Sequence, residues 1–398
     1  MSQLLTPQEI ARSTESVESL TVSTHEIDQS FYAHIAGGYW AWSRLFDRDP
    51  QARITQHPDL VLAELQHSRE TAQRPGCLLV CSQGSEAVAA AILVPKSLGK
   101  LPLVGRPQGY WLVGNQFLGR EDAVAQQLLM QAIGEVMRSK GAGFLLVEDV
   151  AESSPVRAVL ENNAAGLSYF LPAPQQARHT IELPATADAY WGKFTSKTRG
   201  TYRRKVKQFG ACRLERISEI EQVSEFLIRA NEISQHSWQT DLLGLRVKNN
   251  DAELQFFVAL ATQQALRAYL LWKDDVAVSF CIGTQHNGVF SYEEVAYDRR
   301  FADSSPGHVM VIQMLDDLLA HQPPRVFDFG FGDAEYKRQF GTSVTHSANV
   351  WLLPPGLKSK WLMGCWNGRS WLARSARAAL AMTGLRQRIR QLTRRGIK

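Results

Sequence analysis

Two patterns of hydrophobic and polar positions recur along the chain. Short apolar runs bounded by Gly, Pro or Asn are typical of strands, and longer segments with apolar residues at helical spacing are typical of amphipathic helices. In the first half they predict strands over 76–83, 85–96, 106–115 and 143–149, and helices over 120–139 and 154–162. In the second half they predict a strand from His179, a helix over 195–209, a strand over 211–217, helices over 218–236 and 251–264, and strands over 266–275, 276–288, 289–298 and 343–355.

Both halves contain hairpin strands, a strand before a loop, a helix and a further strand, in the same order. This order indicates an internal structural repeat of roughly 170 to 180 residues. The fold class predicted is α/β with a mixed sheet, arranged as two tandem domains. We expect a flexible N-terminal arm over 1–30, domains over 31–178 and 179–354, and a basic amphipathic tail over 355–398.

The net charge of +5 is unevenly distributed. Residues 355–398 hold 3 Lys and 8 Arg with no Asp or Glu, so the first 354 residues carry a net charge of −6. The same tail contains several Trp and Leu residues, a combination that favours a helix on an anionic membrane surface. The alternatives are a disordered basic tail or one that binds RNA.

The sequence shows no basic segment followed by an apolar signal core and no run of 18 uninterrupted apolar residues. We therefore expect a cytoplasmic protein, peripheral on the inner face of the plasma membrane through its tail. The five cysteines are scattered, without a C-x-x-C pair or histidines at zinc-ligand spacing. This spacing predicts reduced thiols, mostly buried, and no metal site.

The stretch 289–342 holds the densest group of candidate site residues. A strand is followed by a polar loop and by Ser-Pro-Gly opening a helix, whose first N–H groups lack intrahelical partners and attract anions. Ser305, Gly307 and His308 are therefore candidates for binding a phosphate group. The alternative is an ordinary helix start, with Ser at the cap and Pro in the first turn.

A glycine-rich turn follows the next predicted strand in that stretch. Glycines allow a ligand to approach the backbone closely or permit a positive φ, and Lys337 supplies a compact positive charge for phosphate. The candidates for orienting an acceptor or moving its proton are Asp328, Asp333 and Tyr336, with Gly332 in the turn.

Glu293 is a further candidate base, next to Glu294 in a predicted strand. Side chains alternate along a strand, so we expect only one of these two to face a given side of the sheet. Trp238, at the end of a predicted helix, is a candidate wall of a cleft, with core packing as the alternative.

The second half resembles the BioF2-like or CelD-like branch of the GNAT acyltransferase superfamily, which is related to the FemAB peptidyltransferases. The resemblance covers roughly residues 180 to 352. It rests on TSKTRGTYRRKVKQF at 195–209, Ser237-Trp238, YD at 297–298, SPG at 305–307 and DFGFGDAEYKRQFG at 328–341. The chain departs from the usual GNAT pattern because it lacks a Q/R-x-x-G-x-G/A loop, and SSPGH supplies one glycine there.

The resemblance implies a splayed mixed sheet, with acyl-CoA, usually acetyl-CoA, in the gap between two parallel strands. It implies that Lys337 lies near a phosphate-bearing substrate and that Lys197 and Arg199, on the basic helix, contact substrate or donor. The function that follows is transfer of an acyl group to an amine or hydroxyl of a sugar or other cell-envelope polysaccharide precursor.

Two alternatives remain open at this point. FemAB-type relatives use aminoacyl-tRNA as donor, and the basic helix is compatible with tRNA, although few aromatic residues accompany it. A non-catalytic accessory protein of exopolysaccharide or cellulose synthesis is the other alternative. Biological output that is unchanged in Lys337→Ala and Asp333→Ala variants but is lost when the tail is deleted would favour that accessory role.

Overall fold

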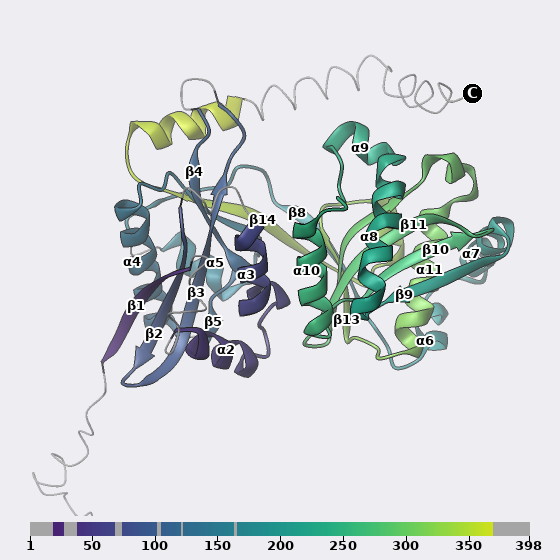
Figure 1. Ribbon diagram of the computed structural model, residues 1–398, viewed down its shortest axis with the longest axis horizontal. Coiled ribbons are helices and arrows are strands. Elements are labelled where there is room, and N and C mark those ends of the chain that lie inside the picture. Colours follow the sequence, from purple (N-terminus) through teal and green to yellow (C-terminus); the bar gives the residue numbers. More distant parts are fainter. Residues whose placement is uncertain are drawn as a thin grey trace, which may run out of the picture.

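The computed structural model describes residues 19–27, 38–67, 74–101, 105–120, 122–162 and 165–368 (Figure 1). A single 14-stranded mixed sheet runs through both halves of the molecule. Its main path has the order β1-β2-β3-β4-β6-β14-β8-β13-β12-β11-β10-β9, with β5 beside β3 and β7 beside β14. The predicted mixed α/β class is therefore confirmed.

The N-terminal half contains the following elements in chain order: β1 (Leu20–Ile27), α2 (Gly38–Arg48), α3 (Pro58–His67), β2 (Gly76–Gln83), β3 (Glu86–Ser97), β4 (Gln108–Leu112), β5 (Leu118–Gly119), α4 (Ala123–Ser139), β6 (Leu145–Ala151), α5 (Pro155–Glu161) and β7 (Ser168–Phe170). Short 3-10 helices, η2 (Ile54–Gln56) and η3 (Val113–Asn115), connect some of them. The predicted strand over 106–115 ends at Leu112, because the backbone turns at Gly114, where φ is +82°.

The C-terminal half contains β8 (Gln176–Glu182), α6 (Ala187–Gly192), α7 (Ser196–Phe209), β9 (Cys212–Ile217), α8 (Ile220–Gln235), α9 (Trp238–Leu243), α10 (Asp251–Thr262), β10 (Ala268–Lys273), β11 (Val276–His286), β12 (Val289–Tyr297), the 3-10 helix η4 (Arg299–Ser304), α11 (Pro306–Ala320), β13 (Val326–Phe331), α12 (Glu335–Phe340) and β14 (Ser343–Leu353). A helix over 357–368 follows.

The expectation of a flexible arm over 1–30 is wrong for Leu20–Ile27, which forms β1. This strand pairs antiparallel with β2 along its whole length. Only Ile27 is buried, so an edge strand with mostly polar and half-exposed side chains left a weak hydrophobic pattern in the sequence. Residues 1–18 lie outside the described part of the chain.

Two parallel strand pairs interrupt the otherwise antiparallel sheet, one in each half. β4 pairs with β6 at Tyr110 and Trp111, and β12 pairs with β13 only from Val289 to Ser291. Each pair is connected through a long helix, α4 or α11, because parallel neighbours need a crossover. Beyond the short paired segments, β12 and β13 separate and the sheet is splayed between them.

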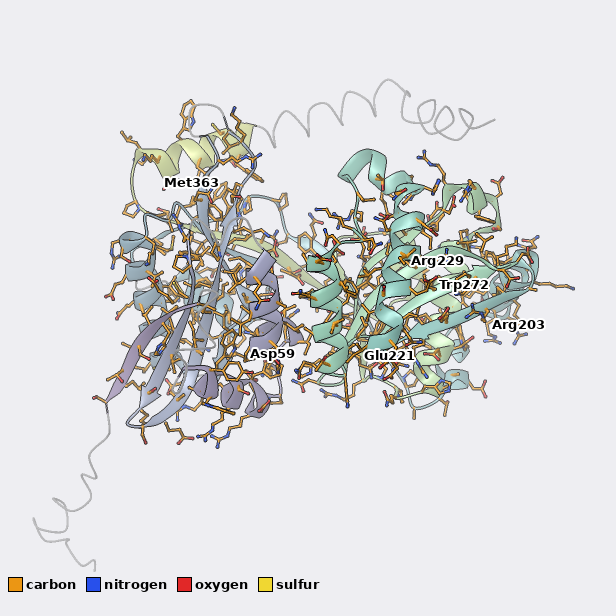
Figure 2. All side chains as sticks on the ribbon, in the orientation of Figure 1. Asp59, Arg203, Glu221, Arg229, Trp272 and Met363 are labelled. Carbon is orange, nitrogen blue, oxygen red and sulfur yellow. The ribbon has the colours of Figure 1, made fainter. Side chains whose placement is uncertain are left out.

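The last strand, β14, joins the two halves. Its beginning, from Ser343 to Ser347, pairs with β8, and its later part pairs with β6 as far as Leu352. The apolar core on one face of the sheet is also shared, because α3 packs beside α10 and Asp59 Oδ2 accepts a hydrogen bond from Gln263 Nε2 at 3.0 Å (Figures 1 and 2). On the opposite face, α4 and α5 cover one half and α6, α7 and α11 the other.

The close contact between β4 and the start of β6 gives a prediction about stability. A Cβ added at Gly109 would collide with the backbone oxygen and ring of Phe144. We expect Gly109→Ala to lower the free energy of unfolding by about 2–3 kcal/mol in denaturant titrations, because the backbone must shift. The control is Gly99→Ala, where nothing lies within 4 Å of an added Cβ. Equal stability of the two variants would contradict the prediction.

Candidate functional site

A cavity of about 990 Å³ lies between the two halves. The N-terminal half contributes the turn from Pro50 to Thr55, Trp111 and the end of β6, and the C-terminal half contributes β11, β12 and the turn after β13. Of the sequence-predicted residues, the structure brings Glu293, Asp328, Tyr336 and Lys337 together in its lining. No cysteine lines the cavity, and Cys77, Cys81 and Cys281 are buried elsewhere. Within the described ranges, no group of three or more possible metal ligands occurs.

Arg178 of β8 is held by two carboxylates at the base of the cavity. Its Nε lies 3.0 Å and 2.9 Å from the two oxygens of Asp328, its Nη2 pairs with Asp328 and its Nη1 pairs with Asp149. Although burial lowers the pKa of Arg178, hydrogen bonds and charge from Asp328 and Asp149 raise it above its ordinary value. Asp328, a predicted catalytic residue, is thus engaged in fixing Arg178 and the turn after β13.

Asp149 has an unusual backbone conformation for a residue in a strand, with φ of +50°. It lies where the pairing of β6 with β14 slips by one residue, opposite Asn349, whose Oδ1 accepts the Asp149 N–H at 2.9 Å. Ser347 Oγ donates to Asp149 Oδ1 at 2.5 Å. A non-glycine residue at positive φ costs conformational energy and requires surrounding contacts that hold it. The contacts with Arg178, Ser347 and Asn349 supply them.

Glu293 lies at a bulge in β12. Ile282 of β11 is opposite Glu294 and Gly283 is opposite Tyr292, so Glu293 is an extra residue without an opposite partner. Because the bulge breaks the alternation of side chains, both glutamates line the cavity, and the expectation that only one faces a given side is wrong. Glu294 is paired with Arg246 at 2.6 Å.

The Glu293 side chain lines the cavity between the halves and is exposed to the solvent there. The protein atoms crowded around the carboxyl desolvate it in part and raise the pKa of Glu293, and the hydrogen bond from Thr284 Oγ1, at 2.8 Å, partly opposes that shift. No described cation forms an ion pair with it. A carboxyl group with a raised pKa in a cleft is suited to accept a proton from an acceptor near neutral pH.

Tyr336 and Lys337 begin α12 on the other side of the splay. Burial raises the pKa of Tyr336 to about 12, so its hydroxyl stays protonated and can donate a hydrogen bond. Lys337 Nζ donates to the carbonyl oxygens of Phe329 and Phe331 at 2.7 and 3.2 Å. These bonds use two of its three donors, and burial lowers the pKa of Lys337.

Arg53, Trp111 and His286 also line the cavity. The Arg53 guanidinium lies deep in the site, where burial first and the charge of Arg178 second lower its pKa. Trp111 Nε1 and His286 Nε2 are buried without a hydrogen-bond partner among the described residues. Both atoms have almost no solvent-accessible surface, so a ligand in the cavity would reach them only after these side chains had moved.

Residues 196–338 match the family model described as an acetyltransferase (GNAT) domain. The crystal structure of FemX superposes with a TM-score of 0.57 at 13% identity, covering 85% of this chain and 98% of FemX. The C-terminal half therefore contains a GNAT domain, and the chain as a whole shares its fold with FemX. The C-terminal DUF2156 domain of a putative lysylphosphatidylglycerol synthetase from Agrobacterium fabrum has a TM-score of 0.53 at 12% identity, covering 82% of this chain and 94% of that domain. No curated protein sequence matches the chain.

In this GNAT-type fold, the predicted phosphate residues lie at the start of α11, away from the cavity lining. Ser305 has a φ of +59° and its side chain makes no cap hydrogen bond, whereas Pro306 occupies the first helical position. A Cβ added at Gly307 would meet only the Tyr297 ring, at 3.8 Å, so the helix start is open. Burial lowers the pKa of His308, with Lys205 of α7 close enough to lower it further.

Acyl-CoA fits this arrangement in its chemistry. The start of α11 and the ammonium group of Lys205 suit a phosphate group, although the His308 N–H already donates to the Ser305 carbonyl at 3.1 Å. β12, which carries Glu293, pairs with β13 only as far as Ser291. Pro at the first position removes one of the N–H donors available in the usual glycine-rich loop.

The remaining predicted residues lie outside the cavity lining. Arg199 Nη1 donates to the Phe194 carbonyl at 2.5 Å, Lys197 is exposed on α7, and Trp238 is 47% exposed at the start of α9. Figure 2 shows Arg203 of α7 at the far end of the C-terminal half from Asp59. In the turn, Gly332 has a φ of +98°, and Asp333 pairs with His179 at 2.9 Å, which lowers the pKa of Asp333.

Sequence reasoning missed several residues of the site, namely Arg53, Asp149, Arg178, Thr284 and His286. One signal was present: Asp149 ends a predicted apolar strand that follows a helix, and ligands of α/β folds collect at such strand ends. The others carry no local pattern, since tertiary contacts alone bring them to the cavity.

The buried ion network gives the second prediction. Replacing Arg178 by Met leaves Asp149 and Asp328 without their counter-charge, and we expect a loss of about 3–5 kcal/mol in the free energy of unfolding. The control is Arg48→Met, which removes an ion pair with Glu86 whose side chains are 69% exposed, and should cost at most about 1 kcal/mol. An Arg178→Met protein as stable as this control would show that the network contributes little.

Proposed function

We propose that the protein is an acyltransferase that moves an acyl group from acyl-CoA to an amine or hydroxyl of an acceptor bound in the interdomain cavity. The observation that carries the proposal is the position of Glu293, at the bulge where β12 leaves β13 and within the cavity lining. The donor then approaches through the splay and the acceptor from the cavity.

Glu293 would act as the general base. It would accept the proton of the acceptor amine or hydroxyl as that group attacks the acyl carbonyl. The thioester C–S bond would then break, and CoA would leave as a thiolate that takes a proton from water. The Tyr336 hydroxyl, protonated because its pKa is raised to about 12, donates a hydrogen bond to the negative charge that develops on the donor side. Most of the rate enhancement would come from holding the donor and the acceptor close together in the orientation that reaction requires.

The acceptor would be anionic. Arg53 and Lys337 are positive groups of the lining, and a guanidinium or ammonium group suits a phosphate or carboxylate. A phosphate-bearing sugar or another cell-envelope precursor has this chemistry together with free amines or hydroxyls.

The base assignment predicts a large loss of rate without a loss of fold. Glu293→Gln should lower kcat by about 100-fold or more, since a positioned general base contributes that much. The control is Asp316→Asn, because burial also raises the pKa of Asp316 but this residue lies outside the cavity lining. A Glu293→Gln enzyme with kcat within a few-fold of the control would remove Glu293 from the mechanism.

The pH profile provides a second readout of the same assignment. A base works only when deprotonated, so kcat should fall as the pH drops through the raised pKa of Glu293, and this limb should disappear in Glu293→Gln. Thr284→Val removes the hydrogen bond that lowers this pKa, so the limb should move to higher pH. If the fall of kcat at low pH occurs at the same pH in Thr284→Val, another group than Glu293 is responsible for it.

An aminoacyl-tRNA donor is the second candidate, and the basic face of α7 favours it. Lys197, Arg203, Arg204 and Lys207 are exposed there, on the helix that packs beside α11. Such a face suits a nucleic-acid backbone.

The two donors are separable by experiment. With radiolabelled acetyl-CoA and a panel of sugar-phosphate acceptors, the leading proposal predicts transfer that persists after RNase treatment, and a rise in melting temperature with acetyl-CoA. The tRNA alternative predicts transfer from charged tRNA that RNase abolishes. Activity with neither donor, together with unchanged biological output in Glu293→Gln cells, would favour the accessory role.

A further inference from the structure

The helix over 357–368 is anchored on the N-terminal half by one face only. Leu362 is buried in a small apolar cluster with Leu101 and Phe144. The Trp366 ring lies 4.6 Å from that of Trp351, and its Nε1 donates to the Pro172 carbonyl at 2.8 Å. Figure 1 shows this helix in yellow at the upper edge of the molecule, and Figure 2 labels Met363 within it.

The outer face of the same helix exposes large apolar side chains. Leu357 is 84% exposed and Trp361, one turn later, is 45% exposed. Residues four apart in a helix lie on the same side, so the two form one apolar stripe. Lys358 and Lys360 are exposed beside it. Leaving a leucine side chain this exposed to water is unfavourable, and contact with an apolar environment outside the protein would remove that cost.

The surroundings of this stripe are basic. The residues that follow, 369–398, contain eight Arg and one Lys and no acidic residue. Lys100 and Arg106 are exposed next to Leu101, which packs in the same cluster as Leu362. No Asp or Glu occurs between positions 96 and 120 of the sequence. A negatively charged surface would therefore meet basic groups from two separate parts of the chain.

We propose that this edge, formed by Leu357, Lys358, Lys360 and Trp361 with Lys100 and Arg106, docks on an anionic lipid bilayer. Leucine and tryptophan enter the boundary between headgroups and acyl chains, while lysine and arginine contact anionic headgroups. RNA would satisfy the basic residues but would give Leu357 no apolar contact, so the lipid surface accounts for both observations. Within the described residues, no helix is long and apolar enough to cross the bilayer.

The test is flotation of the full-length protein with vesicles of phosphatidylglycerol and phosphatidylcholine, compared with phosphatidylcholine alone, at physiological salt. We expect binding to the anionic vesicles only, and at least ten-fold weaker binding for Leu357→Ser/Trp361→Ser. The matched control is Trp40→Ser, because Trp40 is 60% exposed on α2, which Figure 1 shows at the lower edge of the molecule. Trp40→Ser should bind as the unchanged protein does. Circular dichroism would verify that the variants fold.

Three results would overturn the proposal: no binding to anionic vesicles, equal binding of the double variant and the Trp40→Ser control, or displacement of the protein from vesicles by equimolar tRNA. The last result would assign the basic edge to RNA. Blue-shifted Trp fluorescence on vesicle addition, lost in the double variant, would support insertion of Trp361. None of these measurements depends on transferase activity, so the docking surface and the proposed reaction are tested separately.

Discussion

The ion network of Asp149, Arg178 and Asp328 is the interaction on which the arrangement of the site depends. Its three members come from β6, β8 and β13, and thus from both halves of the chain. Burying these charges is costly unless geometry and hydrogen bonding are good, and here Ser347, Asn349 and the Gly330 N–H complete the set of partners. The network therefore holds the floor of the cavity in one arrangement.

The same region concentrates the backbone irregularities of the sheet. A bulge turns Glu293 toward the cavity, a register slip accompanies the positive φ of Asp149, and β13 is irregular between Asp328 and Phe331, where Lys337 binds the carbonyls. Regular strands would satisfy these backbone groups within the sheet. The interruption of regular strand pairing opens the sheet between parallel strands, which is where α/β proteins commonly bind ligands.

The proposed membrane edge and the cavity are connected through Trp111. This residue lines the cavity and also packs against the apolar cluster that anchors the helix over 357–368. Docking by that helix would bring the cavity close to the lipid surface. In the two proposals taken together, the cations of the cavity bind the acceptor and those of the edge bind the lipid headgroups.

The sequence by itself determined the class of fold, because strand and helix periodicities are local properties. It also located the stretch that holds Glu293, Asp328, Tyr336 and Lys337, since the turn glycines and the resemblance of 328–341 are contiguous in the chain. The weak pattern of β1 was missed because an edge strand buries little.

Only the tertiary structure decided which of these residues share a site. Arg178 and Arg53 come from segments far from 289–342 in the sequence, and long-range strand pairing carries them to the same cavity. The sequence also could not show that Asp328 would be paired with Arg178 or that a bulge would turn both glutamates inward. Such features depend on the register between strands, which is set by packing and hydrogen bonding across the whole sheet.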